Sequence, residues 1–330
     1  ERLLAVKELI GELSAFINDV YLVDVAAVAA FYPEWTTIGK GVTNYLAAPD
    51  FPLDEAGTKF VTTGGYIPDG DLSKLQRISV FGDPLLRDNV AESVKHSWYV
   101  GGKGPLHPYK GETVAEYTDF QENGKYSFVK SPTFAGKPAQ VGPLARVLVA
   151  AATNDEAITK HLGRVLGMVK TIANVDVPLA GLHSTIGRHA ARAVMCARNV
   201  EILAGQYELL VANIAAGDTA TFEKPVFPKG EVEGFGFHEA PRGILSHWIV
   251  IEGGVIKNYQ AVVPTTWNAA PRNEQDQRGP YEASLLDTPL ADPEQPLEVL
   301  RTIHSFDPCL ACAVHLVDPD KRDIIQVRAL

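Results

Sequence analysis

The sequence predicts an α+β fold that is mainly helical, with a helical bundle and smaller β portions. Helical periodicity over residues 1–31 and 179–215 indicates the bundle. Two extended runs joined by Gly253-Gly254 indicate a β hairpin. With 330 residues, 46% of them hydrophobic, the chain is long enough to bury a large core, and no clear linker divides it.

Predicted helices and irregular segments alternate in the first part of the chain. Residues 1–31 are expected to be helical because apolar residues recur near helical spacing, namely Leu3, Leu4, Ile10, Leu13, Phe16 and Ile17. Residues 33–76 are rich in Gly and Pro and lack periodicity, which predicts loops and short strands. Residues 84–98 are expected to form another helix. Residues 100–140, with many Gly, Pro and aromatic residues, are predicted to be irregular with short strands.

The clearest predicted helix spans residues 179–215. Residues at alternating steps of four and three share one of its faces, namely Leu182, Ile186, His189, Ala193, Cys196, Val200 and Leu203. Before this helix, the capping-box pattern of residues 153–156 predicts a helix that runs to about Ala173. These helices would form the interior of the bundle.

A hairpin and a last helix are predicted in the remainder of the chain. Residues 246–252 and 255–263 are extended runs on either side of Gly253-Gly254, so they form the two strands of the hairpin. Residues 296–304 are expected to form a helix that leads directly into a cysteine-containing motif.

Composition and charge exclude several classes of function. The formal net charge is −10, and basic residues are scattered, which argues against nucleic-acid binding and against a polybasic membrane surface. No uninterrupted apolar run reaches the ~18 residues of a membrane span; the run from Val20 to Tyr32 comes closest and is interrupted by Asp24. Three cysteines cannot build a disulfide framework, so metal binding explains a clustered pair better.

Two of the three cysteines lie within nine residues, Asp307-Pro308-Cys309-Leu310-Ala311-Cys312-Ala313-Val314-His315. Two thiolates two residues apart can bind one soft or borderline metal ion such as nickel, iron, copper or zinc. A bare Cys-x-x-Cys is also typical of structural zinc sites, redox pairs and iron–sulfur ligands. A site of four thiolates needs four sulfurs, and the remaining cysteine is Cys196. This motif alone therefore has too few sulfurs for such a site, and the resemblance described next implies that the chain carries half of a ligand set.

The full string from Asp307 to His315 resembles the C-terminal metal motif of the nickel–iron hydrogenase large subunit. Further segments resemble this family in the family's order, namely Glu239-Ala240-Pro241-Arg242-Gly243 with Ser246-His247-Trp248, Val263-Pro264-Thr265-Thr266-Trp267-Asn268 with Pro271-Arg272, Gly279-Pro280-Tyr281-Glu282 and, more weakly, residues 20–35 and 184–188. The resemblance covers nearly all of the chain. It implies the large-subunit fold of that family and a C-terminal part, residues 1–330, of a longer large subunit.

The resemblance also implies metal ligands. Cys309 would be a terminal nickel ligand, and Cys312 would bridge nickel and iron. The iron would carry cyanide and carbon monoxide ligands. His315 and the backbone carbonyl of Ala261 would bind a magnesium ion, together with a glutamate from an upstream segment.

The pocket around these metals is implied by the same resemblance. Pro241, Arg242 and Thr265, with Pro264 in the same segment as Thr265, match positions around the diatomic ligands. Arg242 would be a catalytic cation or transient base, and Asp307 its carboxylate partner. Because arginine is normally locked as a cation, the base role is the harder one to sustain.

The implied function is that of a nickel-dependent hydrogenase, an oxidoreductase that reversibly cleaves molecular hydrogen heterolytically. Protons are released, and electrons pass to a small subunit that carries iron–sulfur clusters. The membrane-associated uptake type is implied, at the periplasmic side of the cell membrane and bound to it through partner subunits, with a cytoplasmic location as the alternative. A maturation endopeptidase would remove residues 316–330 as a tail.

Other interpretations stay open at this point. A hydrogen-sensing regulatory protein would use the same site for signalling, and a metal-free scaffold relative, as in respiratory complex I, would keep only the fold. Cys196 and His189 share an apolar helix face and are expected to be core residues. Arg242 could serve as a plain structural ion-pair residue, and Asp307 as a brace for the turn before a proline.

Overall fold

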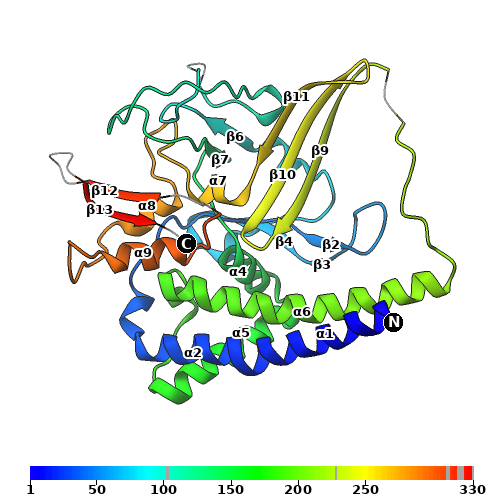
Figure 1. The fold of residues 1–330 in the computed structure, drawn as a ribbon, viewed down its shortest axis with the longest axis horizontal. Helices are drawn as coiled ribbons and strands as arrows, with labels where there is room; N and C mark the ends of the chain where they lie inside the picture. Colours follow the sequence, from blue (N-terminus) through cyan, green and yellow to red (C-terminus); the bar gives the residue numbers. More distant parts are fainter. Residues whose placement is uncertain (102–103, 227–228, 310–312, 318–322, 329–330) are drawn as a thin grey trace.

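The structure is a computed structural model that describes residues 1–101, 104–226, 229–309, 313–317 and 323–328, and only the backbone of the last two ranges. Its fold is mixed α+β, with more residues in helices than in strands. A layer of long helices lies along one side of the molecule, and the β sheets with their connecting loops lie on the other (Figure 1).

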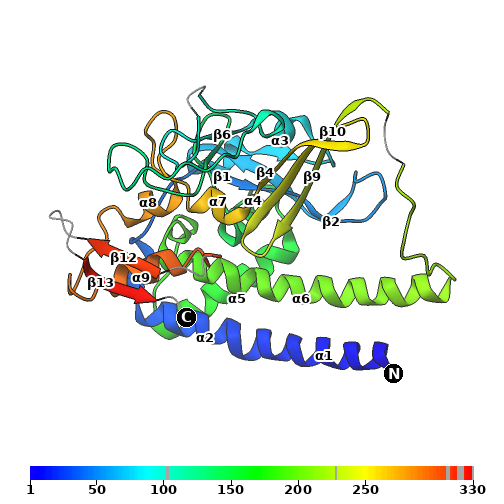
Figure 2. The same ribbon diagram turned by 45° about the horizontal axis from the view of Figure 1, so that its top comes forward.

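The helical layer contains α1 (Arg2–Phe16), η1 (Ile17–Tyr21), α2 (Leu22–Phe31), α4 (Pro143–Thr153), α5 (Glu156–Ala173) and α6 (Thr185–Ala215). The first three follow one another without a break, as the sequence predicts. In both views of the ribbon, α1 lies beside α6 (Figure 2). Aliphatic side chains of α2, α4, α5 and α6 pack into one core with β1 and β4, among them Leu22, Leu148, Val165 and Val194.

Four short strands form a sheet in the order β5 (Gln76–Ile78), β4 (Gly64–Ile67), β1 (Tyr45–Ala47) and β8 (Gln140–Val141). The β1–β8 pair is parallel, and the other pairs are antiparallel. A second, antiparallel sheet has the order β11 (Val255–Val262), β10 (Gly243–Glu252) and β9 (Glu231–Ala240). The predicted hairpin is confirmed as β10–β11, and Gly253 and Gly254 both adopt positive φ in its turn.

Smaller elements connect these layers. The two-stranded sheets are β2 (Asp50–Pro52) with β3 (Phe60–Thr62), β6 (Val90–Ser93) with β7 (Ser131–Phe134), and β12 (Ala313–Val317) with β13 (Asp323–Arg328). The short helices are α3 (Pro84–Asp88), α7 (Pro264–Asn268), α8 (Pro280–Leu285) and α9 (Leu297–His304). Short 3-10 turns are η2 (Pro33–Thr36), η3 (Pro68–Gly70), η4 (Leu72–Lys74), η5 (Pro108–Lys110) and η6 (Leu179–Leu182). The predicted last helix is confirmed as α9.

Two predicted helix boundaries need correction. The helix expected over residues 84–98 ends at Asp88, because the chain then forms β6 and pairs with β7. The helix predicted from the capping-box pattern exists, but its N-cap is Asp155, which accepts hydrogen bonds from the backbone N–H groups of Ala157 and Ile158. Thr153 instead ends α4, a helix that was not predicted.

The long helix α6 begins later than predicted, after its N-cap Ser184. Its buried face is also broader than the predicted stripe. Leu203, expected on the buried face, is 43% exposed. Arg188, by contrast, is only 2% exposed, so a charged side chain occupies a core position of this helix.

Many apolar side chains of the helical layer face outward. None of the residues of α1 is buried, and Leu4, Leu9 and Phe16 are more than half exposed. By length and composition, residues 2–31 form a helix that could cross a membrane. The packing of α2 against α5 and α6 accounts for the apolar residues on its inner side.

Candidate metal centre

A cavity of about 370 Å³ brings together the three motifs that the sequence analysis singled out. Its lining residues are Val129, Ala240, Pro241, Arg242, Leu245, Val263, Pro264, Thr265, Thr266 and Cys309. All four residues predicted to surround the metal ligands therefore line one cavity together with Cys309.

Three separate elements deliver these side chains. Arg242 lies in the tight turn between β9 and β10, and Pro264 is the first residue of α7, where its fixed φ suits a helix start. Cys309 follows α9 by a short turn, and its backbone N–H donates to the Thr265 hydroxyl at 3.3 Å. This bond joins the cysteine segment to α7. Cys309 itself is exposed.

Arg242 and Asp307 form the polar part of the site. The Arg242 Nε donates to the Asp307 carbonyl oxygen at 2.7 Å and lies 3.2 Å from Asp307 Oδ2. Its Nη2 donates to Asp307 Oδ1 at 3.3 Å. The predicted pairing of these two residues is thus present in the structure. The planar guanidinium fork contacts both the main chain and the side chain of Asp307.

Two glycines allow the Arg242 backbone to approach α4 closely. A Cβ atom on Gly243 (φ +130°) would lie 2.5 Å from Val141 Cγ2 and 2.7 Å from the Gly142 nitrogen. A Cβ atom on Gly142 (φ +111°) would lie 2.7 Å from the carbonyl oxygen of Arg242. The glycine that follows Arg242 is therefore required by the close contact of two backbone segments.

We expect Gly243→Ala to lower the free energy of unfolding of the complete large subunit by about 3 kcal/mol, because the new methyl group overlaps backbone atoms and the positive φ disfavours alanine. Urea-induced unfolding measures this change. Gly236→Ala, in the neighbouring strand with open space around its Cβ, is the matched control and should be nearly neutral. Equal effects of the two substitutions would contradict the explanation.

Glu239 holds the other end of the same motif. It is 3% exposed, and its Oε2 accepts a hydrogen bond from the backbone N–H of Ala48 at 2.8 Å. Burial raises the pKa of Glu239 to about 8, and the nearby Arg146 charge offsets only part of this effect. The carboxyl group is therefore largely protonated at neutral pH.

This raised pKa predicts a loss of stability as the pH rises. Between the ordinary glutamate pKa and about 8, the folded state keeps a proton that the unfolded state has released, so the free energy of unfolding falls with increasing pH. In the unsubstituted protein, this group should lower the free energy of unfolding by on the order of 3 kcal/mol between pH 5 and pH 8. Glu239→Gln keeps an acceptor for the Ala48 N–H but cannot titrate, so this pH-dependent fall should be absent in the variant. Melting temperatures at both pH values measure it. Glu233→Gln, on the exposed part of β9, should leave the pH profile unchanged.

Asn268 is a structural residue of the second motif whose role the sequence analysis missed. Its side chain is 1% exposed, donates to the Val141 carbonyl oxygen and accepts from the Val141 N–H, both at 3.1 Å. It thereby mimics a neighbouring strand for β8. The available signal in the sequence was a polar residue, Asn268, between an aromatic and an apolar neighbour. The sequence could not show its partner, because Val141 lies 127 residues away.

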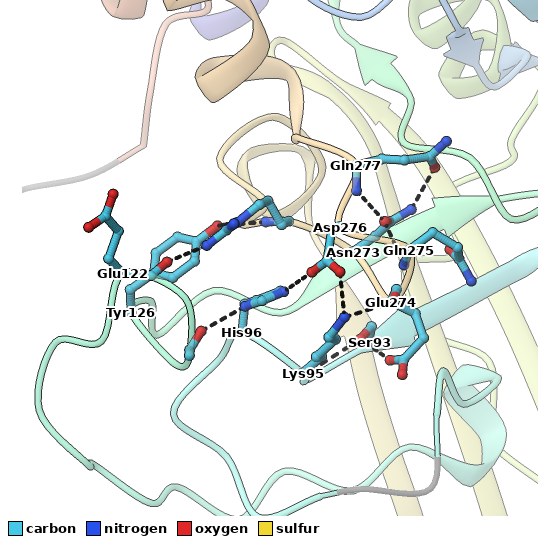
Figure 3. Close-up of polar contacts among 12 residues, drawn as sticks. Ser93, Lys95, His96, Glu122, Tyr126, Asn273, Glu274, Gln275, Asp276 and Gln277 are labelled. Atoms are coloured by element: carbon cyan, nitrogen blue, oxygen red, sulfur yellow. Dashed lines mark hydrogen bonds and ion pairs between the residues drawn. The ribbon is translucent and has the colours of Figure 1, made fainter.

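The segment after α7 is fixed by a polar network (Figure 3). Asp276 accepts from the Nζ of Lys95 at 2.8 Å and contacts the Nε2 of His96 at 2.7 Å, while Ser93 donates to Glu274 at 2.8 Å. The other ring nitrogen of His96 lies 2.7 Å from the carbonyl oxygen of Gly124. Both ring nitrogens of His96 therefore have an oxygen partner within hydrogen-bond distance.

Several predicted site residues are not brought into this cavity. Cys312 lies outside the described residues, and only the backbone of His315 is described, in β12. Ala261 lies on β11 opposite His247 and does not line the cavity. In the part of the chain that the structure describes, no three His, Cys, Asp or Glu side chains are grouped to hold a metal ion.

The two residues expected to be core groups lie near the site on α6. Burial lowers the pKa of His189 to about 4, with further contributions from Arg192 and Arg188, so its imidazole is neutral at pH 7. Burial also raises the pKa of the Cys196 thiol. Neither group has the properties of a thiolate ligand or a charged imidazole at neutral pH.

Comparison with known proteins places the chain in a family. The sequence model of the family described as "Nickel-dependent hydrogenase" matches residues 1–315. The chain belongs to the nickel-dependent hydrogenase family. It is 50% identical over 331 residues to the Hydrogenase-2 large chain of Escherichia coli (strain K12), covering 100% of this chain and 58% of that protein. It is 39% identical over 352 residues to the uptake hydrogenase large subunit of Bradyrhizobium diazoefficiens, covering 99% and 57%.

A solved structure supports the fold of this hydrogenase family member. The reduced, active form of the Ni-Fe-Se hydrogenase from Desulfomicrobium baculatum superposes with a TM-score of 0.77 at 30% identity. The match covers 93% of this chain and 59% of that one. The expectation of a hydrogenase large-subunit fold is thus confirmed. The chain spans about three fifths of the length of the relatives that it matches.

Proposed function

We propose that this chain is the C-terminal part of a nickel–iron hydrogenase large subunit, which reversibly and heterolytically cleaves molecular hydrogen. The observation that carries the proposal is the cavity at which Cys309 meets Pro241, Arg242, Pro264 and Thr265. These residues come from segments far apart in the sequence, and each belongs to a motif that resembles the same family.

The residues of the cavity fit a thiolate-bound centre. Cys309 supplies a soft sulfur ligand, and Cys312, three residues later, supplies a second. When bound, a nickel–iron centre supplies the redox chemistry of hydrogen cleavage. The lining of the cavity is mostly apolar and includes Pro241 and Pro264. The Thr265 hydroxyl and the Arg242 guanidinium are donors for anionic ligands such as cyanide, which need hydrogen bonds when buried.

Arg242 and Asp307 are the proposed catalytic pair. The thiolate of Cys309 accepts the proton released by heterolytic cleavage, and Arg242 provides a positive charge beside the reacting atoms. Asp307 holds the guanidinium in one orientation through two of its nitrogens. Positioning of fixed charge beside the reacting atoms is commonly a large contribution to catalysis.

A second, magnesium-binding site is part of the proposal. His315 and the carbonyl oxygen of Ala261 would be its ligands, with a glutamate from an upstream segment. Residues 316–330 would be the tail that a maturation endopeptidase removes. In its favour, β12, which carries His315, pairs with tail strand β13, with His315 opposite Gln326. Removing β13 would free the strand that follows the cysteines.

The small number of cysteines and the exposed apolar surface of α1 support the remaining proposed partners. With three cysteines in all, the chain needs an iron–sulfur small subunit to carry electrons away. The exposed apolar side chains of α1, including Leu4, Leu9 and Phe16, are suited to contact an upstream part of the large subunit. We place the assembly at the periplasmic side of the cell membrane, bound there through partner subunits, as in membrane-associated uptake hydrogenases.

Purification of the complete large subunit with its small subunit tests the function. We expect nickel and iron by elemental analysis, infrared bands of iron-bound cyanide and carbon monoxide, and hydrogen uptake with an electron acceptor. Zinc alone, or no metal and no such bands, would overturn the proposal and favour a zinc half-site or a metal-free scaffold. A nickel–iron complex with negligible uptake would favour the hydrogen-sensing alternative.

A further inference from the structure

Two arginines of α6 reach the turn that carries Cys309. Arg188 and Arg192 lie one helical turn apart, so both side chains extend from the same face. The Arg188 Nε donates to the Ser305 hydroxyl at 2.6 Å, and the Arg192 Nη1 donates to the Ser305 carbonyl oxygen at 2.9 Å. The Arg192 Nε lies 3.9 Å from Asp307 Oδ2. We call residues 305–309 the ligand turn.

Arg188 is buried without a carboxylate partner in the described part of the chain. Its Nη2 donates to the Gly39 carbonyl oxygen at 2.7 Å and to the Thr185 hydroxyl at 3.5 Å, so the hydrogen bonds of Arg188 go to two hydroxyl groups and one carbonyl group. The guanidinium carbon lies 3.9 Å from the centre of the Phe306 ring, and Tyr281 packs on the same ring at 4.8 Å. Phe306, within the ligand turn, is therefore in contact with both residues.

A buried charge in this position lowers the stability of the fold. Burial lowers the pKa of Arg188 to about 9, which shows how strongly the environment disfavours the cation. An apolar side chain of similar length would fill the same space without that penalty. Packing alone therefore does not explain why an arginine occupies position 188. Its contacts with Ser305 and Phe306 do explain it.

The backbone of the ligand turn needs such support. Asp307 adopts φ +56°, a left-handed conformation that is uncommon outside glycine, and Pro308 follows it. Such a conformation persists when surrounding contacts over-determine it. Arg188 and Arg192 contact the turn from α6, Arg242 contacts it from the β9–β10 turn, and Thr265 accepts from the Cys309 N–H at its far end.

We propose that Arg188 and Arg192 are positioning residues that set the ligand turn and thereby the place of the Cys309 sulfur at the metal centre. The inference rests on the proposed function, because it concerns a residue assigned there as a metal ligand. Neither arginine lines the cavity with Cys309, so both act through Ser305, Phe306 and Asp307.

The test uses the complete heterodimer and measures nickel per folded complex after size-exclusion chromatography. We expect Arg188→Met to lower the nickel content about tenfold, the usual effect of removing a residue that orients a metal ligand. In the nickel-containing fraction, the infrared bands should shift or broaden. Arg198→Met is the matched control, since Arg198 also lies on α6 and bonds a carboxylate, Glu201, but contacts no residue of the ligand turn.

Lysine substitutions distinguish positioning from a role of charge alone. Lys at position 192 can still donate one bond to the Ser305 carbonyl oxygen, so Arg192→Lys should keep most of its nickel. Arg188→Lys cannot serve both the Ser305 hydroxyl and Gly39, and it should lose nickel like Arg188→Met. If both lysine variants retained full nickel and unshifted bands, charge would be sufficient and the proposal would be wrong.

Ser305→Ala covers the case in which Arg188→Met does not fold. It removes the acceptor of Arg188 and leaves the carbonyl acceptor of Arg192 in place. We expect a similar loss of nickel, and full nickel content in folded Ser305→Ala would overturn the proposal. Failure of the proposed function is recognised separately, since the unsubstituted complex would then lack nickel. A loss as large in Arg198→Met would also refute the proposal.

Discussion

Replacement of Cys309 by alanine is expected to remove nickel from the complete large subunit and to abolish hydrogen uptake. Cys309 lines the cavity together with Pro241 and Thr265. If Cys309 is a nickel ligand, as we propose, its loss leaves the metal with an incomplete ligand set. Elemental analysis of the purified heterodimer and a hydrogen-uptake assay measure the two effects.

Cys196→Ala is the control for this experiment. Cys196 lies on α6, is partly buried, and has a raised pKa because of burial. Its loss removes a small apolar group and no ligand, so nickel content and activity should both persist. The site assignment would be refuted if Cys309→Ala retained normal nickel, or if Cys196→Ala lost nickel to the same extent.

Local sequence patterns were sufficient to predict most of the long elements of the fold. Helical periodicity predicted the α1–α2 segment and α6, and Gly253-Gly254 predicted the turn of the β10–β11 hairpin. The helix expected over residues 84–98 was wrong, because β6 pairs with β7, a strand about forty residues later. Long-range strand pairing of this kind overrides local propensity, and periodicity within one segment carries no information on it.

The candidate site was predicted from motifs as a set of residues. The structure brings Pro241, Arg242, Pro264, Thr265 and Cys309 to one cavity. Their roles toward nickel, iron and magnesium stay predictions, as do those of Cys312 and His315. The motifs identified which residues belong to the site, because the residues of each motif are contiguous in the sequence.

The supporting contacts could not be predicted in the same way. Asn268 bonds to Val141, and Arg188 bonds to Ser305, across 127 and 117 residues of sequence respectively. Periodicity placed residues near Arg188 on an apolar face, which gave no reason to expect a buried charge there. Gly243 was part of a recognised motif, but the reason for a glycine is its contact with Gly142, about one hundred residues earlier. Such partners are defined by the fold and not by local sequence.

Arg242→Lys is expected to lower the turnover number about a hundredfold while nickel and iron content stay normal, an effect comparable to the loss of one positioned donor in other active sites. Arg242 uses Nε and Nη2 on three oxygen atoms of Asp307. Lysine has a single nitrogen on a flexible stem, so it cannot keep that orientation even though it keeps the charge. Steady-state hydrogen uptake and elemental analysis of the same preparation measure both quantities.

A matched surface pair shows whether the effect belongs to the site. Arg87 contacts Asp88 through Nε and Nη2 at 2.7 and 3.1 Å, with both side chains exposed. Arg87→Lys breaks a similar fork but should leave turnover unchanged, since exposed ion pairs contribute little. Unchanged turnover in Arg242→Lys would reject the catalytic role of this residue and favour a structural ion pair. Loss of nickel together with turnover would instead mean that Arg242 acts on the ligand turn, as Arg188 and Arg192 do in our proposal, because all three arginines contact residues of that turn.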